Sequence, residues 1–158
     1  MTFETEHSPA RGRVERIWVK RSHRGPMDDR QRARLVVGRG IEDNADQGGK
    51  RQVTIISLER WRQVRTELGA DVDPAARRAN LLVSGIDLEN SRDRVLRAGP
   101  CRLRILGETR PCGRMDEAVP GLRNALDARW GGGAYAEVLA AGNLTVGDDV
   151  EWIAKPGE

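Results

Sequence analysis

Apolar and polar residues alternate in short runs along most of this 158-residue chain. Such a period of two is typical of half-buried strands, because successive side chains point to opposite faces of a sheet. The clearest run is Arg51–Ser57, which carries Val53, Ile55 and Ile56. Glycine, proline, aspartate and asparagine separate the runs, as expected for turns. The pattern predicts strands at 14–20, 35–38, 51–57, 80–84, 94–98, 101–106, 134–139 and 149–153.

Helical periodicity is confined to a few segments. The clearest helix is predicted at 58–68, where apolar residues recur every three or four positions. Ser57 before it is a favoured N-cap, and Gly69 after it is a favoured C-terminal stop. Two further helical segments are predicted, a turn beginning at Asp73-Pro74 and a helix at 121–130 that the glycines 131–133 end. Loops or turns are predicted at 21–29, 40–49 and 143–148.

The order of these segments indicates the fold class. Strands follow one another in pairs more often than they alternate with helices. This order favours a mainly β protein with a few helices (α+β), built as an antiparallel or mixed β-barrel, over a doubly wound parallel sheet. We expect a flexible N-terminal tail at 1–12 and a single domain at 13–158.

Composition excludes several classes of protein. No apolar stretch approaches the roughly 20 residues needed to cross a bilayer, and residues 1–13 lack the apolar run of a signal peptide. We therefore expect a cytoplasmic protein without membrane contact. The net charge is only +3, basic and acidic residues are interleaved, and aromatic residues are scarce. These features disfavour binding to nucleic acid.

The two cysteines have different surroundings. Cys101 shares its parity with Leu103 and Ile105, so we expect it to be buried in the core. Cys112 lies between Pro111 and Gly113, which favour a loop. Arg110 and Arg114 flank it, and nearby guanidinium groups stabilise a thiolate, the form that attacks substrates or binds metals. Cys112 is therefore the candidate reactive or metal-binding sulfur.

The chain lacks the residues that most other catalytic mechanisms and metal sites require. The chain has only two histidines, His7 and His23, and no Cys/His cluster with the spacing of a zinc site. It also lacks the glycine-rich phosphate-binding and dinucleotide-binding motifs. What remains is one thiol together with arginines in or beside loops, namely Arg51, Arg77, Arg78, Arg110 and Arg114. This set suits an anionic, phosphorylated ligand held near a sulfur atom, although any single arginine taken alone is better explained as a solvated surface charge.

Several motifs in order resemble the MOSC domain family, named for the C-terminal domain of molybdenum cofactor sulfurase. The resemblance covers about residues 14–153, and no single motif carries it alone. It rests on the segments 40–43, 51–57, 78–88, 99–105, 110–112, 120–122, 130–139 and 142–150, which include Arg51-Gln52-Val53, Arg110-Pro111-Cys112 and Pro120-Gly121-Leu122.

The resemblance implies a fold, a cofactor and roles for individual residues. The family fold is a mainly β barrel, and its members bind molybdenum cofactor (molybdopterin), a pterin dithiolene with a phosphate. Some relatives reduce N-hydroxylated small molecules with electrons from a redox partner, and others deliver sulfur or cofactor to molybdoenzymes. By resemblance, Cys112 is the molybdenum ligand or sulfur carrier, Asp43 a proton donor or substrate contact, and Arg51, Arg78, Asn80, Arg110 and Arg114 bind the cofactor.

One departure from the family pattern keeps three hypotheses open. Many relatives carry Gly-Asp-x-His in the early loop, where this chain reads Glu42-Asp43-Asn44-Ala45. The first hypothesis is a molybdenum-dependent oxidoreductase acting on N-hydroxylated compounds. The second is a carrier of persulfide sulfur or cofactor without turnover of its own. The third is a binding domain that has lost the cofactor, in which Cys112 is an incidental thiol.

Overall fold

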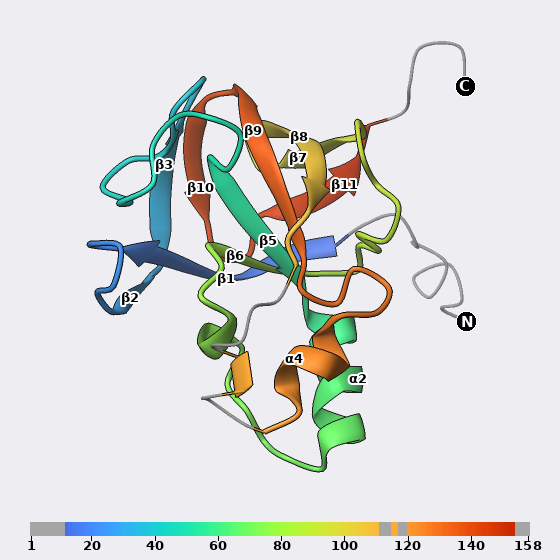
Figure 1. Ribbon diagram of the computed structural model, residues 1–158. Coiled ribbons are helices and arrows are strands. Elements are labelled where there is room, and N and C mark those ends of the chain that lie inside the picture. Colours follow the sequence, from blue (N-terminus) through green and yellow to red (C-terminus); the bar gives the residue numbers. More distant parts are fainter. Residues whose placement is uncertain (1–11, 111–114, 117–119, 154–158) are drawn as a thin grey trace.

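A closed ring of strands forms the body of the protein (Figure 1). The computed structural model describes residues 12–110, 115–116 and 120–153, so the predicted tail lies almost wholly outside it. Neighbouring strands follow the order β11-β7-β8-β9-β5-β6-β1, and β1 pairs with β11 to close the barrel. The strands are β1 (Gly12–Lys20), β5 (Val53–Ser57), β6 (Leu81–Ser84), β7 (Val95–Ala98), β8 (Cys101–Glu108), β9 (Ala134–Ala140) and β11 (Asp149–Trp152).

The barrel is mixed because one pair of its strands is parallel. β5 and β6 run parallel, with Ile55 opposite Leu81, while the other pairs around the ring are antiparallel. A parallel pair needs a long crossover, which here contains α2 (Leu58–Leu68) and the 3₁₀ turn η1 (Pro74–Arg77). The predicted mainly β barrel with few helices is confirmed.

Alternating side chains fill the barrel. In β8, Cys101, Leu103 and Ile105 are fully buried, whereas Arg102 and Arg104 between them are exposed. The other strands contribute aliphatic residues in the same way, so the core is one continuous apolar cluster. Burial of such side chains is the main favourable term in folding. The prediction that Cys101 is a core residue is confirmed.

Four short strands lie outside the ring, and the sequence predicted only one of them. They are β2 (Met27–Arg30), β3 (Arg32–Val36), β4 (Gly40–Ile41) and β10 (Gly142–Thr145). β2 pairs with β1, and β10-β3-β4 form a separate sheet. The predicted loop at 21–29 is therefore wrong in its last part, and the predicted turn at 143–148 is wrong in its first part. Neither β2 nor β10 has a clear alternation of apolar and polar residues. Each forms a strand because it pairs with a distant strand.

The helix α2 has the predicted bounds and caps. The Oγ of Ser57 accepts a hydrogen bond from the N–H of Arg60 at 3.2 Å, and Gly69 ends the helix in a left-handed conformation with φ 63°. Trp61 is 1% exposed, and its Nε1 donates to the carbonyl of Val72 at 2.8 Å. Figure 1 shows α2 beside α4 (Leu122–Leu126) at one end of the barrel. A second apolar cluster, which includes Met115, joins these two helices.

The helix predicted at 121–130 is shorter in the structure. α4 ends at Leu126, and Arg129 and Trp130 have φ values of 55° and 58°, which no α-helix accommodates. The glycines that follow are required by packing. A Cβ on Gly133 would lie 2.2 Å from the carbonyl oxygen of Ile55, and φ there is 98°. Close approach to the backbone of β5 therefore explains this glycine.

Among the described residues, no helix combines the length and the apolar character needed to cross a membrane.

Candidate functional site

A cavity with a strongly basic lining lies between β1, β5 and the start of β6. Its volume is about 660 Å³. Five of its lining side chains carry or can carry positive charge, and Asp46 is its one acid among the described residues. We call it the basic cavity. Its lining consists of Lys20, His23, Ala45, Asp46, Gln47, Gly48, Arg51, Thr54, Arg77, Arg78, Ala79, Asn80, Thr109, Met115 and Gly132.

Asp46 joins two of the basic side chains. Its Oδ2 lies 2.8 Å from Nζ of Lys20, and its Oδ1 lies 3.2 Å from Nδ1 of His23. Lys20 is the last residue of β1, and His23 belongs to the loop between β1 and β2. One carboxylate therefore holds the lysine and the imidazole on the same side of the cavity.

The turn η1 places two consecutive arginines, Arg77 and Arg78, in the lining of the cavity. Nε of Arg77 donates to the carbonyl of Gly132 at 2.9 Å, which ties η1 to the glycine segment. Arg78 caps η1 in a left-handed conformation with φ 62°. Its Nη2 donates to the carbonyls of Gly25 at 2.7 Å and His23 at 3.5 Å. A guanidinium group has five N–H donors, and the hydrogen bonds found for the Arg78 guanidinium within the described residues all involve Nη2. Arg78 thus fixes the β1–β2 loop and retains donors for a ligand.

Asn80 forms part of the cavity wall, and its side-chain amide makes four hydrogen bonds within the protein. It is 5% exposed. Its Nδ2 donates to the carbonyl of Trp18 and to Oδ1 of Asn44, both at 3.2 Å. Its Oδ1 accepts from N–H of Thr54 at 3.1 Å and from the Thr54 hydroxyl at 3.2 Å. An amide offers two donors and two lone pairs, so Asn80 connects β1, β5 and the loop after β4.

The early loop after β4 supports the cavity wall. Asp43 has φ 73°, a left-handed conformation. Asn44 is 5% exposed, and its Oδ1 accepts from N–H of Lys20 at 2.8 Å. Ala45 and Asp46 line the basic cavity, and Asp46 offers it a polar side chain.

The structure brings together three of the predicted site residues. Arg51, Arg78 and Asn80 line the basic cavity, and the guanidinium of Arg51 also lies 5.2 Å from the ring centroid of Tyr135. Arg110 is exposed and lines another hollow, with Asp116 and Arg123.

The remaining predicted site residues are not among the described residues that line the basic cavity. Asp43 is exposed and is not among the residues that line the basic cavity. Cys112 and Arg114 lie outside the described residues. The roles predicted for all of these residues stay predictions.

Sequence reasoning missed Lys20, His23 and Asp46 as members of one site. Lys20 ends β1 and His23 lies in the next loop, whereas Asp46 lies after β4, and no motif relates them. The available signal was the rarity of lysine and histidine, since the chain has only three lysines and two histidines. Among the described residues, no three His, Cys, Asp or Glu side chains come together as a direct metal site.

The buried thiol of Cys101 is not a candidate for the reactive sulfur. Cys101 is 0% exposed, and burial, with a smaller effect of Asp148, raises the pKa of its thiol from 9.0 to about 11. A raised pKa keeps the thiol protonated, whereas nucleophiles and metal ligands are thiolates. The reactive role predicted for Cys112, which lies outside the described residues, stays a prediction.

We expect this burial to give a measurable pH dependence of stability. Between pH 9.0 and about pH 11 the unfolded chain loses the Cys101 proton while the native state keeps it. The unfolded state then binds fewer protons, so the free energy of unfolding falls as pH rises. Urea denaturation of wild type and Cys101→Val across this range checks the effect. The variant should lose less stability than wild type, and parallel curves would contradict the assignment.

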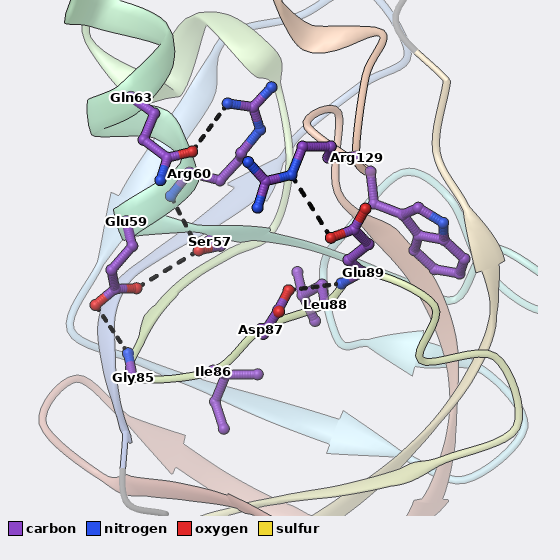
Figure 2. Close-up of a pocket in the computed structure, with 11 residues that line it drawn as sticks. Ser57, Glu59, Arg60, Gln63, Gly85, Ile86, Asp87, Leu88, Glu89 and Arg129 are labelled. Atoms are coloured by element: carbon purple, nitrogen blue, oxygen red, sulfur yellow. Dashed lines mark hydrogen bonds and ion pairs between the residues drawn. The ribbon is translucent and has the colours of Figure 1, made fainter. Parts of the chain in front are cut away.

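A second cavity, of about 360 Å³, lies at the N-terminus of α2 (Figure 2). Its charged groups bond to backbone N–H groups or to other side chains. Glu59 accepts from N–H of Gly85 at 3.0 Å, and Nε of Arg129 lies 3.6 Å from Glu89. Figure 2 shows these pairs around the opening, with Ile86 and Leu88 beside them. None of the predicted site residues that the structure describes lines this cavity, so the basic cavity is the candidate site.

Comparisons with known proteins agree with the sequence resemblance. The family model described as MOSC domain matches residues 21–151. The YuaD protein of Bacillus subtilis has a similar structure, with a TM-score of 0.77 and 20% identity over 90% of this chain and 95% of that one.

YiiM from Geobacillus stearothermophilus superposes with a TM-score of 0.74 and 14% identity, over 92% of this chain and 77% of that one. YiiM from Escherichia coli gives 0.67 and 16%, over 92% and 72%. At these identities the likeness shows the fold alone. No curated protein sequence matches the chain.

Proposed function

Because this chain belongs to the MOSC domain family, we propose that it binds molybdenum cofactor in the basic cavity and reduces N-hydroxylated compounds there, with Cys112 as the molybdenum ligand. The observation that carries the proposal is the convergence of Lys20, His23, Arg51, Arg77 and Arg78 on one cavity with a single described acid. Charged donors of this kind bind phosphate, and arginine can do so through two parallel hydrogen bonds.

The cavity fits a group of this size and charge. Pockets for cofactors and small ligands typically have volumes of about 300–1,000 Å³, and the basic cavity has about 660 Å³. Its lining also contains the neutral polar side chains of Gln47, Thr54 and Thr109. Their donors bond within the protein, and their oxygen atoms have further lone pairs that suit the N–H groups of a pterin. Arg51 and Arg78 are the residues we assign to the cofactor, and Asn80 holds the surrounding strands in place.

The position of Cys112 in the chain is consistent with this role. Thr109 and Met115 line the basic cavity, and each is three residues from Cys112 in sequence. Three residues span at most about 11 Å when fully extended. On this spacing along the chain we base the proposal that Cys112 can reach a ligand in the cavity. Arg110 and Arg114 lie beside it in sequence, where their charge would favour the thiolate that a metal requires.

The division of chemistry between cofactor and protein follows from these assignments. The bound cofactor would supply the two-electron redox centre, and the protein would bind, orient and tune it. The basic side chains would neutralise the phosphate, and Cys112 would provide a soft sulfur ligand. We propose a small N-hydroxylated molecule as substrate and a separate redox protein as electron donor.

The alternative is a carrier of sulfur or cofactor that has no turnover of its own. Asp46 favours the sulfur carrier, because a carboxylate in the cavity wall would repel a phosphorylated ligand. In that case Cys112 would carry a persulfide, which reductants release as sulfide. A molybdoenzyme would then be the partner.

We expect protein produced with ample molybdate to contain near-stoichiometric molybdenum and pterin. Arg78→Ala should lower cofactor affinity about tenfold or more, since a hydrogen bond to a charged group contributes about 1.5–3 kcal/mol. Plasma mass spectrometry of protein dialysed at limiting cofactor measures the loss. Arg62→Ala, which removes an exposed arginine of α2, is the matched control.

Equal molybdenum in wild type and both variants would show that the cofactor lies elsewhere. If wild type contained no molybdenum but released sulfide on reduction, the carrier function would be supported in place of the enzyme function. If the wild-type protein contained no molybdenum and released no sulfide, the remaining function would be that of a plain binding domain.

A further inference from the structure

We infer that His23, oriented by Asp46, donates the proton that converts the leaving hydroxyl of an N-hydroxylated substrate into water. This inference rests on the proposed function and adds to it a residue outside the motifs of the family resemblance. It is carried by the contact between His23 and Asp46 at the wall of the basic cavity.

The imidazole is oriented by its carboxylate partner. Nδ1 of His23 lies 3.2 Å from Oδ1 of Asp46, so this carboxylate holds the proton of Nδ1. Nε2 is then the nitrogen that can exchange a proton with a ligand, and no partner for Nε2 is found among the described residues. A carboxylate that fixes one ring nitrogen and leaves the other for chemistry is a recurrent arrangement in general acid–base catalysis.

The loop that carries His23 is also fixed. Nη2 of Arg78 donates to the carbonyl oxygens of Gly25 at 2.7 Å and His23 at 3.5 Å. The other carboxylate oxygen of Asp46 is held by Nζ of Lys20 at 2.8 Å. The ring of His23 is 77% exposed to solvent, so it can regain a proton from water after each turnover.

The proposed reaction requires such a donor. Reduction of R–NH–OH to R–NH₂ and H₂O consumes two electrons and two protons. The N–O bond breaks, the leaving oxygen takes a proton from Nε2 of His23, and the nitrogen takes the second proton from water. The two electrons come from an external reductant, a redox protein or a reduced viologen dye. A hydroxide leaving without a proton would develop a full negative charge, which general acid catalysis avoids.

Other described residues of the cavity are poor proton donors. The guanidinium groups of Arg51, Arg77 and Arg78 do not release protons in proteins. Lys20 is held in its ion pair with Asp46, and both oxygens of the Asp46 carboxylate contact the nitrogens of Lys20 and His23. Hydroxyl and amide side chains complete the polar lining. An imidazole is the side chain whose charge changes in the neutral pH range, so His23 is the group with suitable chemistry.

The test uses the cofactor-loaded protein with reduced methyl viologen and benzamidoxime. We expect His23→Gln to lower kcat about 100-fold while KM and molybdenum content change little, because glutamine keeps a donor for Asp46 without an exchangeable acid. In His23→Ala, added imidazole should restore part of kcat, a rescue that a structural role would not give. His7→Gln, which removes the other histidine of the chain, is the control.

A second readout does not depend on turnover. In metal-free protein, ¹⁵N NMR of the His23 ring should show a protonated, hydrogen-bonded Nδ1 in wild type, and this signal should be lost in Asp46→Asn. If wild type is active and the kcat of His23→Gln lies within twofold of it, the inference about His23 is overturned and the proposed function is not. Wild type that contains molybdenum and does not turn over would overturn the reductase proposal and this inference together.

Discussion

Replacing Cys112 with alanine is expected to abolish turnover and to remove most of the molybdenum from the protein. The thiolate is the one sulfur ligand that the proposed site draws from the chain, because Cys101 is buried in the barrel core and keeps its proton. Alanine offers neither a charge nor a lone pair to a metal. Loss of a metal ligand belongs to the small group of single substitutions with very large effects.

The measurement pairs metal analysis with turnover of an N-hydroxylated substrate. Wild type, Cys112→Ala and Cys101→Ala are purified in parallel, and thermal denaturation confirms that each is folded. Cys101→Ala should lose stability through a cavity in the core and keep its molybdenum. Retained turnover in Cys112→Ala would refute the ligand role. Retained molybdenum without turnover would show that Cys112 acts in the chemistry and does not bind the metal.

The second large effect is expected for Asn80→Ala, as a loss of stability in protein without cofactor. The substitution leaves the carbonyl of Trp18, Oδ1 of Asn44 and N–H of Thr54 without the hydrogen bonds that Asn80 provides. Oδ1 of Asn44 keeps the hydrogen bond from N–H of Lys20, so the Trp18 carbonyl and the Thr54 N–H carry the main loss. Each buried polar group left unpaired costs about 1 kcal/mol or more, so we expect the free energy of unfolding to fall by about 2 kcal/mol or more.

Urea denaturation of the metal-free protein at 25 °C measures this loss. Asn143→Ala is the matched control, since Asn143 is exposed on β10 and a surface substitution typically changes stability by less than about 0.5 kcal/mol. The result also separates two roles for Asn80. A variant of unchanged stability that binds cofactor weakly would mean that Asn80 binds the ligand directly and not through the strands it connects.

Features with local causes could be predicted from the sequence. The bounds of α2 follow from an apolar period, a serine that caps the first turn and a glycine that ends the last one, all within a dozen neighbouring residues. The burial of Cys101 follows from the alternation in β8. The mainly β barrel follows from the order of the strands, and the family follows from the order of the motifs.

Features with distant causes could not be predicted. The residues of β2 read as a polar loop and become a strand because β1 offers its edge, with Val19 opposite Asp28. β10 becomes a strand because β3 pairs with it, with Leu144 opposite Ala33. The early end of α4 depends on the turn at Arg129 and Trp130, whose left-handed backbone no local signal indicated.

The sequence by itself therefore determined the barrel class, the main helix with its caps, the identity of the family and the separation of the buried thiol from the candidate reactive one. Hydrophobic period, caps and motif order act over a few residues, so they can be read along the chain. Only the tertiary structure decided that Lys20, His23, Asp46, Arg51, Arg77 and Arg78 share one cavity. Closure of the barrel brings these residues together, because pairing between distant strands sets which loops meet and leaves no periodic trace in the sequence.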